Sequence, residues 1–175
     1  MLRSRLLTAA VALPILILMV CCAPSWLFAV IFFSLTAVGL HEYFTITQSA
    51  VVLPPVVGIG WGGAVSGAMM VGTPETAVAM LLAGFFLTFA LSLRDLQPQR
   101  SFAGLSVMLL GVIYVGFLLP HLVWVRALPD GIAWVFFILL VVMIGDSAAY
   151  GAGRMWGKRK LIPHISPGKT IEGCI

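Results

Sequence analysis

Six long apolar runs occupy most of this 175-residue chain, and they constrain its fold more than any other feature. Only 9% of the residues are charged, against roughly 25% in an average soluble domain, so there is too little polar surface to cover a water-soluble particle. Within lipid, helices pair their own backbone groups and open strands do not. A spanning helix needs roughly 17–25 residues. The runs have these bounds: Leu6–Cys22, Trp26–Phe44, Val51–Val71, Ala77–Leu93, Phe102–Leu119 and Ile132–Ile144.

The sequence therefore predicts an all-α, polytopic membrane protein: about six transmembrane helices followed by a cytoplasmic helix end and a loop. Turn-forming segments such as Pro54-Pro55 and Leu128-Pro129-Asp130-Gly131 separate the runs. If the N-terminus is cytoplasmic and the runs alternate, nine of the ten Lys and Arg residues lie inside and only Arg126 lies outside. Arg3 and Arg5 before the first run also fit a signal peptide, although we favour a retained helix.

The net charge of +4 does not point to nucleic acid, because the charges sit at the ends of apolar runs. We therefore expect the lipid bilayer, and no nucleic acid, as a partner. Cys21, Cys22 and Cys174 lack metal-ligand spacing and are interpreted as small apolar residues.

Residues 145–175 concentrate the chemical groups that the apolar runs lack. In the helix expected here, small residues recur at four-residue spacing, which allows another helix to approach closely: Gly145, Ala149, Gly153 and Gly157. The neighbouring stripe carries an acid, a phenol and two cations: Asp146, Tyr150, Arg154 and Lys158. This stripe is either a functional site or an ordinary helix end whose cations lie at the lipid surface and pair with the acid.

The helix is expected to stop before Pro163 and Pro167, and Ser166-Pro167-Gly168 is typical of a turn. A Walker A loop is excluded, because Pro163 stands where that motif needs glycine. A loop with a lysine, hydroxyls and exposed amides can still bind phosphate, and the alternative is a plain turn between helices. Together, the cations, the acid and the membrane location favour a substrate with a lipid part and a phosphate part.

From Asp146 to Gly173 the sequence resembles the bacterial CDP-diacylglycerol synthases, also called phosphatidate cytidylyltransferases. Their segment has the form D-S-x-A-Y-x-x-G-R-x-x-G-K-x-K-L-x-P-x-I-S-P-x-K-T-x-E-G, and this chain matches it throughout. The resemblance implies a nucleotidyltransferase of phospholipid biosynthesis in a bacterial-type inner (plasma) membrane, with its site on the cytoplasmic side. Such an enzyme joins CTP and phosphatidate, releases pyrophosphate, forms CDP-diacylglycerol and requires Mg²⁺.

The resemblance also assigns roles to residues of the segment. Asp146 and Lys169 are the expected catalytic residues, and Asp146 is also a candidate metal ligand. The expected substrate-binding residues share polar or charged side chains: Ser147, Tyr150, Arg154, Lys158, Lys160, Ser166, Thr170 and Glu172. We expect residues 1–144 to form the transmembrane region and residues 145–175 to begin the catalytic motif region.

Members of that family carry two further acidic segments, D-x-x-E-S and H-G-G-x-x-D-R-x-D, that these 175 residues lack. We therefore expect the main metal ligands outside this sequence, and we interpret the chain as the N-terminal part of such an enzyme, inactive on its own. A transporter subunit and a non-catalytic membrane assembly protein are the alternatives. A homodimer is left open.

Overall fold

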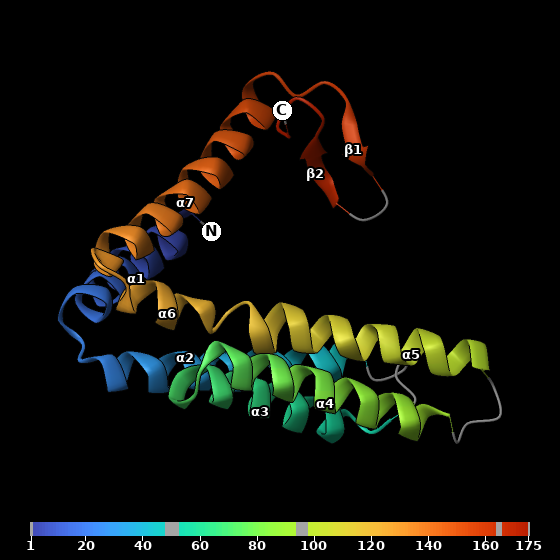
Figure 1. Ribbon diagram of the computed structural model, residues 1–175. Helices are drawn as coiled ribbons and strands as arrows, with labels where there is room; N and C mark the ends of the chain where they lie inside the picture. Colours follow the sequence, from blue (N-terminus) through green and yellow to red (C-terminus); the bar gives the residue numbers. More distant parts are fainter. Residues whose placement is uncertain (1, 48–52, 94–97, 164–165, 175) are drawn as a thin grey trace. The chain divides into compact units, whose positions relative to one another are not determined.

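The computed structural model describes residues 2–47, 53–93, 98–163 and 166–174 (Figure 1). Its elements follow one another along the chain in this order: α1 (Leu2–Cys22), α2 (Ser25–Thr47), α3 (Pro55–Val71), α4 (Pro74–Ser92), α5 (Pro98–Gly111), the π-helix η1 (Val112–Phe117), α6 (His121–Ala127), α7 (Gly131–Met155), β1 (Lys160–Ile162) and β2 (Ser166–Thr170).

The predicted all-α membrane architecture is confirmed. Over its described residues each apolar run forms a helix; the fifth run forms most of α5 and all of η1, and α6 follows it. By length and composition, four helical stretches can cross a membrane: Ser25–Thr47, Pro74–Ser92, Gln99–Ala127 and Gly131–Met155. Ala10–Cys22 and Pro55–Val71 are shorter apolar helices. Residues 51 and 52 of the third run and the loop at 94–97 lie outside the described residues.

The chain divides into two compact units, Met1–Pro129 and Asp130–Ile175. The functional division predicted between residues 144 and 145 lies inside α7 of the second unit and stays a prediction.

The first unit is organised around α3, which packs against α2, α4 and η1. Its buried core residues are contributed by α2, α3, α5 and η1: Leu40, Phe44, Trp61, Val65, Met108 and Val112. Gly116 of η1 faces the backbone of Gly62, because a Cβ at Gly116 would lie 2.9 Å from the Gly62 Cα atom. The absence of a side chain at Gly116 thus allows η1 and α3 to come into backbone contact.

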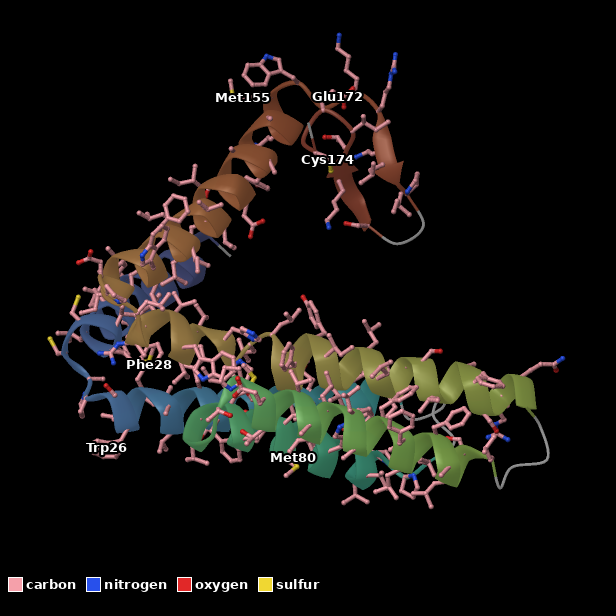
Figure 2. All side chains as sticks on the ribbon, in the orientation of Figure 1. Trp26, Phe28, Met80, Met155, Glu172 and Cys174 are labelled. Atoms are coloured by element: carbon pink, nitrogen blue, oxygen red, sulfur yellow. The ribbon has the colours of Figure 1, made fainter. Side chains whose placement is uncertain are left out.

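Polar side chains tie helix ends together in this unit. The Arg126 guanidinium at the end of α6 donates hydrogen bonds to the carbonyl oxygens of Val20 and Ala23 at the end of α1. It also lies 4.6 Å from the ring centroid of Phe28, which Figure 2 labels. Trp124 Nε1 donates to the Met69 carbonyl near the end of α3, at 2.6 Å. The C-terminal ends of α1, α3 and α6 therefore lie together, as the predicted alternation of the runs requires.

Candidate functional site

The candidate site lies in the second unit, where α7 changes character along its length. Its first half is almost entirely apolar, and Asp146 is its first acid after Gly131. A helix of 25 residues is about 37 Å long, whereas the hydrocarbon core of a bilayer is about 30 Å thick. If α7 begins at one edge of the hydrocarbon core, residues 131–150 cross it, so Asp146 lies about 7 Å inside the far edge and Arg154 lies in the headgroup region.

The chain after α7 returns on itself as a two-stranded antiparallel hairpin of β1 and β2. Lys160 pairs with Thr170 and Ile162 with Ser166, with an irregularity in register between the two pairs. The Ile171 amide continues the pairing by donating to the Arg159 carbonyl at 3.0 Å. A loop was expected here, and the strands were not predicted, because helical periodicity does not relate the paired residues, which lie four to twelve positions apart.

The end of this hairpin packs on the small-residue stripe of α7. A Cβ on Gly153 would lie 2.9 Å from Thr170 Oγ1, and a Cβ on Gly173 would lie 2.7 Å from the Ala149 carbonyl oxygen. A close partner for the stripe was predicted correctly, but the partner is the chain's own strand end and turn rather than another helix. Nothing approaches within 4 Å of a Cβ built on Gly145, one turn before Ala149.

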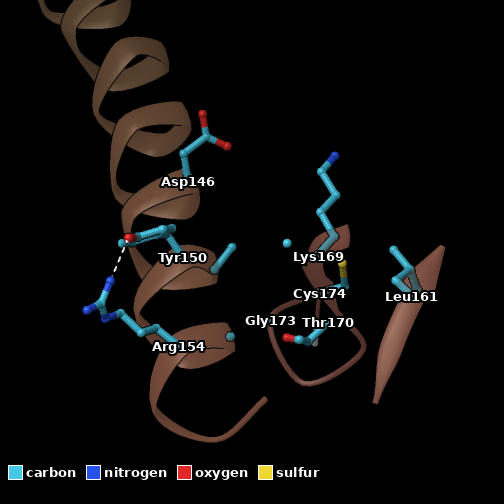
Figure 3. A pocket seen from close by; sticks show the side chains of 11 residues that line it. Asp146, Tyr150, Arg154, Leu161, Lys169, Thr170, Gly173 and Cys174 are labelled. Carbon is cyan, nitrogen blue, oxygen red and sulfur yellow. Dashed lines mark hydrogen bonds between the residues drawn. The ribbon is translucent and has the colours of Figure 1, made fainter. Parts of the chain in front are cut away.

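Between α7 and the end of the hairpin lies a pocket of about 700 Å³ (Figure 3). This volume is within the range of about 300–1,000 Å³ that is typical of small-molecule sites. Five of the predicted site residues line it: Asp146, Tyr150, Arg154, Lys169 and Thr170. In Figure 3, Asp146, Tyr150 and Arg154 project from α7, and Lys169 lies across the pocket from Asp146. The folding of the hairpin thus brings together residues that are up to 24 positions apart.

Two of these side chains are held in place by the site itself. Arg154 Nη1 donates a hydrogen bond to the Tyr150 hydroxyl at 3.2 Å, one helical turn away. Figure 3 shows this bond on the side of α7 away from Lys169. Thr170 is only 6% exposed, and its hydroxyl has no hydrogen-bond partner among the described residues. The hydroxyl oxygen lies against the small-residue stripe of α7, 2.9 Å from a Cβ built on Gly153 and 2.7 Å from one built on Gly157.

The other predicted site residues lie outside the pocket: Ser147, Lys158, Lys160, Ser166 and Glu172. Glu172 has a clear structural role. Its carboxylate accepts hydrogen bonds from the backbone N–H groups of Lys158, at 3.2 Å, and Arg159, at 3.3 Å. The Glu172 pKa lies below its usual value because the carboxylate accepts a hydrogen bond from its own backbone N–H and then from those of Arg159 and Lys158. These hydrogen bonds hold the turn after β2 against the segment that follows α7.

Two residues that line the pocket, Cys174 and Leu161, were not predicted from the sequence to belong to a site. Cys174 lines the pocket but was interpreted only as a small apolar residue, and Leu161 of β1 received no role. The pairing of Lys160 with Thr170 places Leu161 and Cys174, which follow these two residues in the chain, near α7. A pattern of turn residues around Pro163 and Pro167 was the available signal for a hairpin.

The predicted magnesium site has little protein support within this pocket. Among the described residues, no group of three or more His, Cys, Asp or Glu side chains is placed to hold a metal ion. Asp146 is the pocket's one carboxylate among those residues, and Mg²⁺ takes six oxygen ligands. The described pocket residues therefore supply one carboxylate to a Mg²⁺ ion, and the magnesium site stays a prediction.

Comparison with known proteins identifies the family. The model of the cytidylyltransferase family matches residues 3–175. The phosphatidate cytidylyltransferase of Bacillus subtilis is 31% identical over 103 residues, which are 58% of this chain and 37% of that protein. Those of Staphylococcus saprophyticus and Staphylococcus haemolyticus are 40% and 42% identical over 86 residues, 49% of this chain and 32% of each relative.

The chain thus spans about a third of the length of the curated relatives that it matches. No solved structure matches it significantly. The family model, however, covers nearly every residue, including the apolar helices and the whole of the pocket. The predicted resemblance is confirmed, and this chain belongs to the cytidylyltransferase family.

Proposed function

We propose that this chain forms part of a phosphatidate cytidylyltransferase, which converts CTP and phosphatidate to CDP-diacylglycerol and pyrophosphate. The observation that carries the proposal is the pocket that gathers Arg154, Lys169 and Asp146 at the end of an apolar membrane helix. The named relatives support the substrate class, because the three quoted above are all phosphatidate cytidylyltransferases.

The location of the pocket suits two substrates of different polarity. Asp146 lies 15 residues after the start of α7, about 23 Å along the helix, and Arg154 lies about 12 Å further. The pocket therefore extends from the edge of the hydrocarbon toward water. A phosphatidate headgroup can enter from the lipid, and a nucleotide can enter from the aqueous side.

The proposed reaction is a phosphoryl-group displacement. A phosphate oxygen of phosphatidate forms a bond to the α-phosphorus of CTP, and the bond between that phosphorus and the oxygen bridging to the β-phosphate breaks. The electron pair leaves with pyrophosphate. Such a reaction depends mainly on positioning and on neutralising phosphate charge, with little covalent help from the protein.

In this scheme Arg154 and Lys169 bind phosphate oxygens, and Tyr150 positions the Arg154 guanidinium. Thr170 packs on Gly153 and so fixes the end of β2, including Lys169, beside α7. Asp146 orients the substrate and is the pocket carboxylate available to a nucleotide-bound Mg²⁺. The metal would supply additional neutralisation of phosphate charge, and its remaining ligands are expected outside the described residues.

Several finer predictions accompany this proposal. The substrate-binding roles of Ser147, Lys158, Lys160, Ser166 and Glu172 stay predictions, as do the cytoplasmic position of the site and a homodimer. We also propose that residues 145–175 begin a catalytic region and that the 175 residues alone are inactive. Both proposals rest on the two acidic segments of the family that this sequence lacks.

The test measures transfer of label from radiolabelled CTP to lipid in the presence of phosphatidate. Two proteins are compared: the 175-residue chain, and the same chain joined to the part of the Bacillus subtilis relative that follows the matched segment. We expect labelled CDP-diacylglycerol from the joined protein and none from the 175 residues alone. If the joined protein folds in the membrane but forms no product, while the intact Bacillus subtilis protein does, the proposal is wrong.

A further inference from the structure

A second group of cations lies beside the pocket but outside it. Residues 155–162, which run from the last residue of α7 through β1, include Lys158, Arg159 and Lys160, and none of the three lines the pocket. The side chains of Lys158 and Arg159 are exposed. We call residues 155–162 the basic segment. Its cations are thus separate from Arg154 and Lys169, which face the pocket.

The basic segment also exposes large apolar side chains on both sides of its cations. Met155 is 71% and Trp156 is 65% exposed, while Leu161 and Ile162 are 40% and 46% exposed. Figure 2 labels Met155 at the end of α7 and Glu172 beside the basic segment. Cations between exposed aromatic and aliphatic side chains are typical of protein surfaces that lie in the headgroup layer of a membrane.

The backbone of the basic segment is held in one conformation. The Glu172 carboxylate binds the N–H groups of Lys158 and Arg159, and the Arg159 carbonyl accepts from the Ile171 amide at 3.0 Å. Glu172 is the one acid in residues 155–174, where three cations of the basic segment and Lys169 lie. The segment is therefore a preorganised surface with a net positive charge.

The length of α7 places this surface at the membrane boundary. Residues 131–150 of α7 are enough to cross a hydrocarbon core of about 30 Å, so the helix end and the basic segment emerge among the headgroups. Trp156 would lie at the depth that tryptophan prefers, between hydrocarbon and water. The partner that matches this depth and charge is a phospholipid headgroup, rather than a soluble anion.

We propose that the basic segment, residues 155–162, binds anionic phospholipids of the surrounding bilayer that are not substrates, at a surface separate from the pocket. Lys158 and Arg159 bind the headgroup phosphates, which for Lys158 would replace the substrate-binding role expected from the sequence, while the exposed side chains of Trp156 and Ile162 insert beside the glycerol backbone. This inference does not depend on the proposed reaction, because the assay below measures lipid binding and not turnover.

The test uses the full 175-residue chain in neutral detergent micelles, titrated with a fluorescent phosphatidylglycerol and followed by anisotropy. Each cation near a membrane surface contributes a factor of about five to binding. The double variant Lys158→Gln/Arg159→Gln should therefore bind about 25-fold more weakly. Exchange of the two cations, Lys158→Arg/Arg159→Lys, should keep the affinity, and Trp156→Ala should lower it severalfold.

Two control proteins locate the effect. Arg100→Gln removes an exposed cation of α5, and Arg154→Gln/Lys169→Gln removes the two pocket cations. Neither should change the affinity for phosphatidylglycerol. The inference is overturned if the double variant of the basic segment binds as tightly as the unchanged chain, or if the pocket variant loses as much affinity. Equal binding of fluorescent phosphatidylcholine, or displacement by inorganic phosphate at constant ionic strength, would also overturn it.

Discussion

The two units of this molecule use small residues in the same way but for different purposes. In the first unit, Gly116 admits the backbone of Gly62 and closes a helix bundle. In the second unit, Gly153 admits Thr170 and closes a hairpin onto α7, which leaves a pocket beside the contact. A glycine that allows close contact thus contributes to the core in the first unit and to one side of the pocket in the second.

Burial separates the units as well. Within the apolar window of α2, 28% of the residues are buried, whereas the corresponding share for α7 is 6%. In α2 the buried residues belong to the core of its own unit, whereas α7 buries few apolar side chains within its own unit. Because few side chains of α7 are buried, polar residues on its last turns replace little packing.

The largest expected effect is on catalysis, and it tests whether the second unit is the functional one. In the protein that forms CDP-diacylglycerol, Lys169→Ala or Asp146→Ala should lower the rate at least about 100-fold, because a charge contact to the reacting phosphates is removed. Label transfer from CTP to lipid measures this change. Arg100→Ala in the first unit is the matched control and should keep the rate. Unchanged activity in either pocket variant would remove these residues from the site.

The second effect is on stability and tests the backbone contact in the first unit. Gly116→Ala places a Cβ 2.9 Å from the Gly62 Cα atom, so the two helices must separate. We expect a loss of about 1–3 kcal/mol in the free energy of unfolding, measured by denaturant titration in mixed micelles. Gly145→Ala, where a Cβ meets nothing within 4 Å, should be neutral or stabilising. Similar losses in both variants would show that steric contact is not the cause.

A smaller loss is expected at the helix ends of the first unit. Arg126→Gln removes hydrogen bonds to the Val20 and Ala23 carbonyls and the contact with the Phe28 ring. Hydrogen bonds to charged groups contribute about 1.5–3 kcal/mol each at most, and partial exposure of Arg126 reduces this, so we expect about 1–2 kcal/mol. Thermal unfolding in detergent measures the change. Arg100→Gln, on an exposed part of α5, should leave the midpoint unchanged, and an equal shift there would contradict the prediction.

The smallest expected effect is the pH dependence of the hydrogen bonds that the Glu172 carboxylate accepts in the second unit. Glu172 has a lowered pKa in the folded protein, so its contribution to stability is present above the unfolded-state pKa and is lost as pH falls through the folded value. Protonation should weaken the bonds to the Lys158 and Arg159 amides below about pH 4. Hydrogen exchange of these two amides should speed up there relative to other amides of the hairpin. In Glu172→Gln the extra acceleration should be absent, and its persistence would assign the effect to another group.

Much of this protein was readable from the chain alone. The apolar runs determined the helical membrane fold, because a continuous apolar segment of this length pairs its own backbone groups in lipid when it forms a helix. The four-residue spacing also placed Asp146, Tyr150 and Arg154 on one helix face, which the structure confirms. These features depend on composition and on local periodicity, and both are properties of contiguous sequence.

The tertiary structure alone decided which of the predicted residues meet. The hairpin brings Lys169 and Thr170 to the pocket of Asp146 and Arg154, while Lys158 and Lys160, which fit the same sequence motif, lie outside it. Glu172 binds backbone amides rather than lining the pocket. Strand register and the packing of a turn on Gly153 determine these positions, and both arise from contacts between segments that helical periodicity does not relate.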